Sequence, residues 1–202
     1  TNLSSDQILV KKPLIFATGS EIRKNIAESH GIVCEFIKSE VDEELIKLNF
    51  HGNDFDKLAI QLATEKALTI SDKNKDYFVV GVDQVCSLDE EILNKPGNKD
   101  NAIVSLQKLS GKTHHQNCGM AICKDGKIIW QSSAIAELTM KDLTLDEIER
   151  YLDLDEPFSC SGSYKFEANG KDLFLNVIGS EYTIQGMDID QLIEAFYREG
   201  II

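Results

Sequence analysis

The stretch LIFATGSEIRKNIAESHGI, residues 14–32, decides how this chain begins to fold. Its apolar run over 14–18 predicts a buried strand, and the pattern over 20–29 predicts a helix that follows at once. The N-terminus of a helix carries unpaired N–H groups and the positive end of the helix dipole, so a turn of this kind binds anions readily. Ser20 and Arg23 could contact a phosphate there. In the simpler interpretation Ser20 only caps the helix and Arg23 lies in solvent.

The remaining elements alternate between helix and strand patterns. We expect strands at 33–38 and 77–82, helices at 54–71, 98–109, from Thr144 and at 187–200, a hairpin turning at LDEE (88–91), and long antiparallel strands over 114–140 that turn at Asp125-Gly126. SEVDEE (39–44) is interpreted as an acidic loop. This order predicts an α/β protein that leans towards α+β, with a mixed β-sheet flanked by helices.

Length and composition indicate an ordinary globular protein. The chain has 202 residues, of which 42% are hydrophobic and 27% charged. It has no apolar run near the roughly 18 residues that a membrane span needs, and its first residues do not resemble a signal peptide. Five cysteines without a CxxC motif are expected to be reduced thiols of a cytoplasmic protein.

The net charge restricts the choice of ligands. With 34 acidic and 21 basic residues the formal charge is −13, which argues against non-specific binding to nucleic acids or anionic membranes. Any local cluster of Lys and Arg is therefore more informative than it would be in a basic protein.

Two ionisable residues stand beside apolar elements. Counting back by fours from Lys66 gives Leu62 and Leu58, so Lys66 lies on or beside the apolar stripe of its helix. It could reach past the core into a cleft or snorkel to solvent. Asp83 follows the apolar run at 77–82, and we expect it at the carboxyl end of that strand. It could hold a cation such as Mg²⁺, accept a proton, or form a turn.

Lys95, in ILNKPGN (92–98), is either one more solvated lysine or a further cation for the same ligand. The four histidines make no zinc pattern, and there is no Walker sequence, GxGxxG or GxSxG. Arg23, Lys66 and Lys95, together with Asp83 and Glu43, suit a nucleoside triphosphate held as its Mg²⁺ complex.

Several segments, in their order along the chain, resemble the Maf family of nucleotide pyrophosphatases, also called septum-formation inhibitors. They are LIFATGSEIRKNIAESHGIVCEFIKSEVDEE (14–44), LATEKAL (62–68), VVGVDQVCSLDEEILNKPGNKDNAIVSLQKLSGKTHHQNCGMAI (79–122) and CSGSYKFEANG (160–170). The likeness runs from about residue 12 to 200 and implies a single domain over 12–202 after an extension at 1–11. It also implies an elongated, inosine-triphosphatase-like fold of two lobes with a central cleft.

The resemblance implies an activity and a role for each matching residue. The family hydrolyses nucleoside triphosphates between the α and β phosphates with Mg²⁺, or with Mn²⁺ or Co²⁺, and is thought to remove modified nucleotides. Asp83 matches the proposed catalytic aspartate, Ser20 and Arg23 the phosphate-binding SxxR segment, and Lys66 and Lys95 the catalytic lysines. Glu43 matches the acidic residue after the second strand and would join Asp83 in binding metal.

Three positions separate the branches of the family, and here they are Ile22, Gln84 and Glu167. Gln84 and Glu167 resemble the branch that acts on 7-methyl-GTP, in which a carboxylate could accept hydrogen bonds from N1–H and the exocyclic amine of guanine. Ile22 departs from that branch, which commonly has an aromatic residue that stacks on the base. Glu21, Asn94 and Asp188 depart as well, since they replace a proline, a glycine and a proline.

The sequence thus predicts a cytoplasmic, Mg²⁺-dependent nucleoside triphosphate pyrophosphatase that binds neither nucleic acid nor membranes. It leaves homodimerisation, the preferred metal and the physiological nucleotide open. The departures at Glu21, Ile22 and Asn94 motivate an alternative, a non-catalytic nucleotide-binding or cell-division regulatory protein on the same fold. A pyrophosphatase of the inosine-triphosphate type would share the chemistry but prefers other opening motifs.

Overall fold

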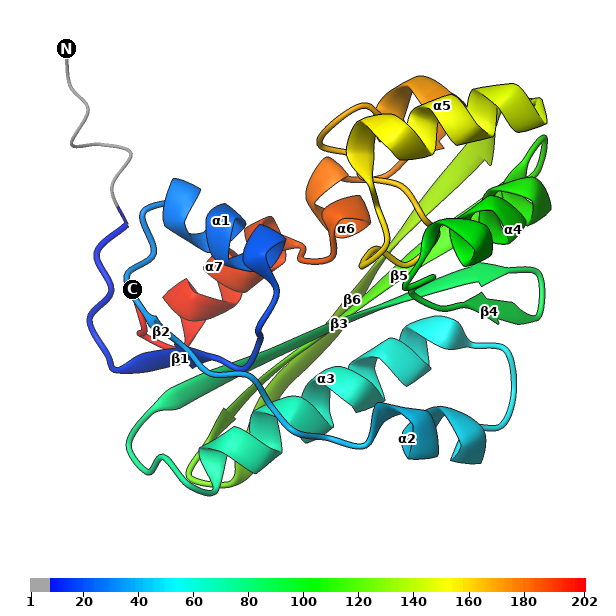
Figure 1. Cartoon of the computed structure of the whole chain (residues 1–202). Helices are drawn as coiled ribbons and strands as arrows, with labels where there is room; N and C mark the ends of the chain where they lie inside the picture. The colour runs from blue at the N-terminus through cyan, green and yellow to red at the C-terminus, as the bar shows by residue number, and fades with distance from the viewer. Residues whose placement is uncertain (1–7) are drawn as a thin grey trace, which may run out of the picture. The chain divides into compact units, whose positions relative to one another are not determined.

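The computed structural model describes residues 8–202, which form a mixed β-sheet flanked by helices (Figure 1). The strands are β1 (Leu14–Phe16), β2 (Glu35–Phe36), β3 (Phe78–Leu88), β4 (Glu91–Leu93), β5 (Thr113–Lys124), β6 (Lys127–Met140) and β7 (Phe174–Ile178). The helices are α1 (Glu21–Ser29), α2 (Glu43–Asn49), α3 (Phe55–Ser71), α4 (Lys99–Leu109), α5 (Leu145–Asp155), the 3-10 helix η2 (Gly170–Leu173), α6 (Glu181–Gln185) and α7 (Ile189–Arg198).

The seven-stranded sheet has the order β2-β1-β3-β5-β6-β7, and β4 pairs with β3 beside this path. β1 runs parallel to both β2 and β3, whereas the β3–β4 and β6–β7 pairs are antiparallel. The mixed sheet predicted from the sequence is therefore confirmed.

Local sequence signals account for most of the boundaries. Asp125 and Gly126 have φ of 50° and 76°, as a two-residue hairpin turn requires, and they join β5 to β6. Thr144 and Glu147 form a capping box at the start of α5, where the sequence predicts a helix from Thr144. The helices expected at 54–71, 98–109 and 187–200 are α3, α4 and α7.

Two predictions were wrong. The segment 39–44 is not all loop, because Asp42 caps α2 and Glu43 and Glu44 form its first turn. Asp83 does not end its strand, because β3 continues to Leu88. Val85 and Cys86 beyond it are buried, and Cys86 to Leu88 pair with β4, so the strand gains both packing and hydrogen bonds by continuing.

The chain divides into two compact units, and it passes from one to the other within β3, β5 and β6 and again between α6 and α7. The first unit holds the described chain up to Asp83, with Cys118–Ala134 and Gly186–Ile202. The second holds Gln84–Asn117 and Ile135–Gln185. Of the predicted extension at 1–11, residues 1–7 lie outside the described chain, and the Lys11 amide donates a 2.7 Å hydrogen bond to the Ile201 carbonyl.

In the first unit, α3 and α7 cover opposite faces of the sheet, as successive β1 residues reveal. Ile15 belongs to a core cluster with Ala67 and Ile70 of α3. Phe16, the next residue, packs edge-on against Phe196 of α7, with ring centroids 6.2 Å apart. Side chains alternate between the faces of a strand, so the two helices lie on different sides.

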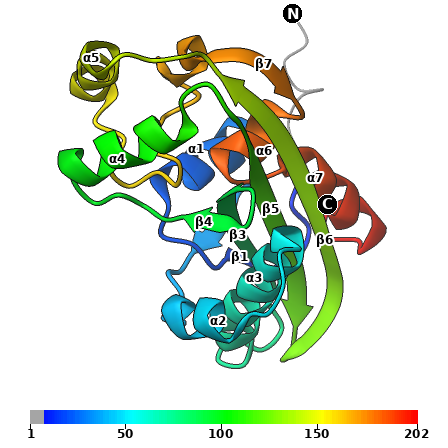
Figure 2. The same ribbon diagram turned by 90° about the vertical axis from the view of Figure 1, so that its right-hand side faces the viewer.

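In the second unit, α4 and α5 contact each other and contribute to one apolar core with residues of β3, β4, β6 and β7 (Figure 2). Its fully buried members include Leu106 and Leu109 of α4 and Leu152 of α5. Across residues 8–202, no helix has the length and apolar character needed to cross a bilayer.

Candidate active site

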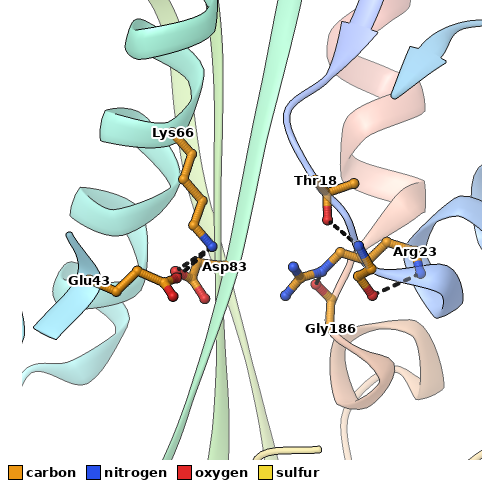
Figure 3. Close-up of polar contacts among 7 residues, drawn as sticks. Thr18, Arg23, Glu43, Lys66, Asp83 and Gly186 are labelled. Carbon is orange, nitrogen blue, oxygen red and sulfur yellow. Dashed lines mark hydrogen bonds and ion pairs between the residues drawn. The ribbon is translucent and has the colours of Figure 1, made fainter. Parts of the chain in front are cut away.

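Glu43, Lys66 and Asp83 form a compact charge cluster in the first unit (Figure 3). The Lys66 Nζ lies 2.6 Å from the Glu43 Oε1 and 3.1 Å from the Asp83 Oδ2. The side chains of Lys66 and Asp83 are only 15% and 11% exposed, against 39% for Glu43. Of the two alternatives that the sequence left open for Lys66, the structure shows the first: the side chain reaches a polar site and does not snorkel to solvent.

A close approach of helix to strand places this cluster. A Cβ added at Gly81 of β3 would lie 1.9 Å from the Ala63 carbonyl oxygen of α3, so only glycine permits this packing. Asp83 lies two residues beyond Gly81 and thus on the same strand face, and Lys66 lies one turn beyond Ala63 on the same side of α3. The packing of Ala63 on Gly81 thereby brings the ammonium to the carboxylate.

Glu43 joins the cluster from the first turn of α2, which contacts α3. Burial would raise the pKa of Glu43, but the hydrogen bond and the positive charge of Lys66 outweigh burial and lower the pKa to about 2. Both interactions stabilise the ionised form, so Glu43 is a carboxylate throughout the physiological pH range.

The donor set of the cluster fits a hard divalent cation. Glu43 and Asp83 present carboxylate oxygens, the ligands that Mg²⁺ prefers. Both oxygens point at one position, beside which the Lys66 ammonium lies. Within residues 8–202, no three His, Cys, Asp or Glu side chains group closely enough to hold a metal by themselves. Phosphate oxygens and water would have to complete the coordination, as is usual for Mg²⁺.

The turn from β1 to α1 contains the predicted phosphate-binding residues. The Ser20 Oγ accepts a 3.4 Å hydrogen bond from the Arg23 amide, and the Thr18 Oγ1 accepts one of 3.1 Å from the Ser20 amide. Ser20 is therefore the N-cap of α1. Its hydroxyl uses a lone pair for this bond and retains its proton for donation, so capping and phosphate binding are compatible.

Arg23 is held by one side of its guanidinium group. Its Nε donates a 2.9 Å hydrogen bond to the Gly186 carbonyl, just before α7. Figure 3 shows the terminal nitrogens pointing towards the cluster of Glu43, Lys66 and Asp83. The Cys118 thiol lies near both Arg23 and Asp83. Burial raises the pKa of Cys118 to about 12, while the charge of Arg23 lowers this pKa and the charge of Asp83 raises it.

The other predicted site residues belong to the second unit, except for Ile22, which is half-buried in the first turn of α1. Gln84 donates from its Nε2 to the Thr183 and Ile184 carbonyls of α6, at 3.1 and 2.7 Å. Lys95 is exposed, between β4 and α4, and lines a hollow of about 240 Å³. Glu167 is exposed in the loop before η2. Their predicted roles in substrate binding and catalysis remain predictions.

Two residues beside this site had no role predicted from the sequence. Gly186 orients Arg23 through its backbone, which no side-chain pattern reports. Asp188, where the family usually has proline, is buried and accepts a 2.9 Å hydrogen bond from Gln191 Nε2 beside the start of α7. An aspartate that follows the apolar Met187 and precedes a helix is typical of a helix N-cap, and this was the signal that the sequence offered for Asp188.

The fold is mixed α/β, and it directs an arginine at a helix N-terminus towards a cluster of carboxylates and an ammonium group. These features define a class of proteins that can bind a polyanion together with a cation. Within that class, the chain belongs to the family described as Maf-like protein, which matches residues 13–199. The prediction of this family from the sequence is confirmed.

Named relatives cover nearly the whole chain. A nucleoside triphosphate pyrophosphatase of Legionella pneumophila (strain Lens) is 38% identical over 196 residues, 97% of this chain and 98% of that protein. A 7-methyl-GTP pyrophosphatase of Brucella abortus biovar 1 (strain 9-941) is 34% identical over 193 residues, 94% and 97% of the two chains. A solved HAM1 protein from Coxiella burnetii shares the fold, with a TM-score of 0.51 at 11% identity, over 93% of this chain and 100% of that one.

Proposed function

We propose that this protein hydrolyses nucleoside triphosphates between the α and β phosphates, releasing a nucleoside monophosphate and pyrophosphate. The observation that carries the proposal is the charge arrangement in the first unit, where Arg23 faces a lysine flanked by two carboxylates (Figure 3). The activity named for the Legionella relative, at 38% identity over 97% of this chain, agrees with it.

The turn before α1 binds the phosphates in this mechanism. The N-terminal N–H groups of α1 and the Ser20 hydroxyl donate to phosphate oxygens. Because the Nε of Arg23 is bonded to the Gly186 carbonyl, the terminal nitrogens are fixed as a two-pronged donor for the same oxygens. Glu21 places one negative charge in the first turn of α1, so phosphate affinity depends on Arg23 more than on the helix dipole.

Glu43 and Asp83 would hold the divalent ion. When bound, Mg²⁺ neutralises phosphate oxygens and lowers the pKa of coordinated water. The ordinary pKa of an aspartate is roughly 3.9, so an aspartate in water is a weak base at neutral pH, and a cation that acidifies the water makes proton removal easier. Mn²⁺ and Co²⁺ could serve in place of Mg²⁺.

In the hydrolytic step, the oxygen of a water molecule attacks the α phosphorus while the bond from that phosphorus to the bridging oxygen breaks. Asp83 accepts the proton of the attacking water and passes it to solvent. Lys66 and Arg23 stabilise the negative charge that grows on the departing pyrophosphate, and the family resemblance adds Lys95 to this role.

The preferred base is the finer part of the proposal, and we infer guanine, specifically 7-methyl-GTP. Support comes from the resemblance at Gln84 and Glu167 and from the activity named for the Brucella relative, at 34% identity. A carboxylate at Glu167 would accept from two N–H groups of guanine, whereas thymine and uracil offer one N–H between two carbonyls.

An isotope experiment tests the reaction. The protein is incubated with Mg²⁺ in H₂¹⁸O and with 7-methyl-GTP, GTP, dTTP or UTP, and the products are analysed by mass spectrometry. We expect pyrophosphate as the released product and ¹⁸O in the monophosphate, because water attacks the α phosphorus. Orthophosphate release, or ¹⁸O in the pyrophosphate, would contradict the proposed bond cleavage. Nucleotide binding without any product would favour the non-catalytic alternative.

Two controls accompany this assay. EDTA is expected to abolish release, and addition of Mg²⁺ to restore it. Lys66→Met is expected to lose activity, whereas Lys57→Met, on the same helix but in an exposed pair with Asp54, is expected to retain it.

A further inference from the structure

The loop that carries Glu167 is anchored on both sides of this residue by side chains of the second unit. The loop spans 160–170, CSGSYKFEANG, and contains neither helix nor strand before η2 begins at Gly170. Glu167 itself is exposed. An exposed carboxylate on an irregular segment can select a base only if the backbone beneath it is held in place.

Helix α5 supplies the first anchors. The Tyr151 hydroxyl accepts a 2.8 Å hydrogen bond from the Lys165 amide. One turn further along α5, Asp155 accepts bonds of 2.9 Å from the Asn169 amide and 2.7 Å from the Asn169 side chain. Tyr151 and Asp155 are both buried. The backbone is thus held two residues before and two residues after Glu167.

Strand β5 supplies the second set. The Tyr164 hydroxyl is 2.7 Å from the His114 Nε2 and accepts a 2.8 Å bond from the Gln116 Nε2. Gln116 also donates at 3.3 Å to the Ser161 carbonyl. All three ring or amide side chains are buried, and burial lowers the pKa of His114 to about 4, so the imidazole is neutral at physiological pH.

The loop approaches this strand closely. A Cβ added at Gly162, whose φ is 89°, would lie 2.9 Å from the Tyr164 ring and 3.2 Å from the Gln116 Nε2. Behind Glu167, the Ala168 and Gly170 amides both donate to the Lys165 carbonyl, at 3.1 and 2.9 Å. The segment under Glu167 is therefore a closed turn with little room to rearrange.

We propose that Tyr151, Asp155 and the Gln116–Tyr164 pair are positioning residues that hold the Glu167 carboxylate for recognition of the nucleobase. This inference rests on the proposed function and adds the residues that set base selectivity through Glu167. A carboxylate that accepts from two neighbouring N–H groups discriminates only in one orientation, and a displacement of about 1 Å can cost roughly 10²-fold in kcat/KM.

The test compares Tyr151→Phe with a matched control on the same helix. Tyr151→Phe removes one hydroxyl and keeps the buried ring, and Asp153→Asn changes an exposed carboxylate of α5 that pairs with Lys99. For each variant, kcat and KM are measured with 7-methyl-GTP and with UTP. We expect Tyr151→Phe to lower the selectivity ratio of kcat/KM values by about tenfold, mainly through KM, as for the loss of one net hydrogen bond, and Asp153→Asn to leave it unchanged.

A double-mutant cycle separates positioning from a general loss of structure. In the Glu167→Gln background, Tyr151→Phe is expected to have no further effect on the ratio, because its target has already been removed. Asp155→Asn is expected to behave in the same way, and thermal melting of each variant checks that it is folded.

Two outcomes are distinguishable. A wild-type chain that releases no pyrophosphate overturns the proposed function and this inference with it. The inference alone is overturned if the wild type is active and selective but folded Tyr151→Phe and Asp155→Asn keep its selectivity ratio of kcat/KM values. It is also overturned if these variants lower the ratio equally with and without Glu167.

Discussion

Lys66→Met should reverse the way in which the Glu43–Lys66–Asp83 cluster contributes to stability as the pH changes. In the wild type, Lys66 lies between two carboxylates, 2.6 Å from the Glu43 Oε1 and 3.1 Å from the Asp83 Oδ2. Methionine has a similar length and no charge, so the variant keeps the packing on α3 and loses only the cation. Two carboxylates then face each other in a site where Asp83 is 11% exposed.

The loss of unfolding free energy that Lys66→Met causes at neutral pH follows from how deeply the ion pair is buried. Breaking a buried ion pair by removing one partner typically costs about 3–5 kcal/mol, because the remaining charge is left uncompensated. The Lys66–Asp83 pair meets this condition, since the two side chains are 15% and 11% exposed. Glu43 is 39% exposed and better screened by solvent, so it adds less.

The pKa shift of Glu43 determines whether the cluster stabilises the protein more at neutral or at acidic pH. In the wild type the pKa of Glu43 is lowered to about 2 from 4.5, so its contribution to stability is present above pH 4.5 and is lost as the pH falls towards 2. Without Lys66, the cation that lowers the pKa of Glu43 most is gone, and the two carboxylates repel each other. The contribution of this cluster to the stability of the variant is then least favourable at neutral pH and recovers on acidification, because a shared proton relieves the repulsion.

Urea unfolding of wild type and variant at pH 7 and at pH 4, at one ionic strength, measures this difference. We expect the difference in unfolding free energy to be about 3–5 kcal/mol at pH 7 and clearly smaller at pH 4. Lys57→Met, which breaks an exposed pair with Asp54 on the same helix, should cost less than about 1 kcal/mol at both pH values. A loss below 1 kcal/mol for Lys66→Met at pH 7, or one that is independent of pH, would refute the reasoning.

Three further predictions concern catalysis, phosphate binding and acid stability. Asp83→Asn and Lys95→Ala should each lower kcat by at least about 10²–10³, and near-normal turnover by both would refute their assignment. Arg23→Lys should raise KM for the triphosphate at least tenfold in steady-state assays, because lysine cannot bond Gly186 and grip two phosphate oxygens together; an unchanged KM would count against it. Burial lowers the pKa of His114 from 6.5 to about 4, so the wild type should lose about 3 kcal/mol from this group between pH 7 and 4, and urea unfolding should show a smaller loss for His114→Gln. Equal losses in both proteins would exclude His114 as the cause.

Patterns of short range predicted much of the fold. The periodicity of 54–71 gave α3, the Thr144 capping box gave the start of α5, and Asp125-Gly126 gave the hairpin between β5 and β6. Each of these signals acts over a few residues, and tertiary packing reinforces it.

Where short-range patterns failed, packing from distant segments decided. The strand ending expected at Asp83 did not occur, because Val85 and Cys86 beyond it are buried. Helix α2 was not predicted because it has no buried apolar face, and its leucines Leu45 and Leu48 are exposed. Asp42, followed by these leucines, was nevertheless a recognisable helix start signal.

For the site, the sequence by itself marked the residue types: a helix that follows a strand directly at Ser20, a lysine on or beside an apolar stripe at Lys66, and a carboxylate directly after an apolar run at Asp83. It did not determine which charges meet. That was decided by contacts between segments far apart in the chain, namely Ala63 on Gly81, α2 on α3 and Arg23 on Gly186. The physical reason is that a charge is stabilised by whatever lies within a few ångströms of it, and that neighbourhood exists only once the chain has packed.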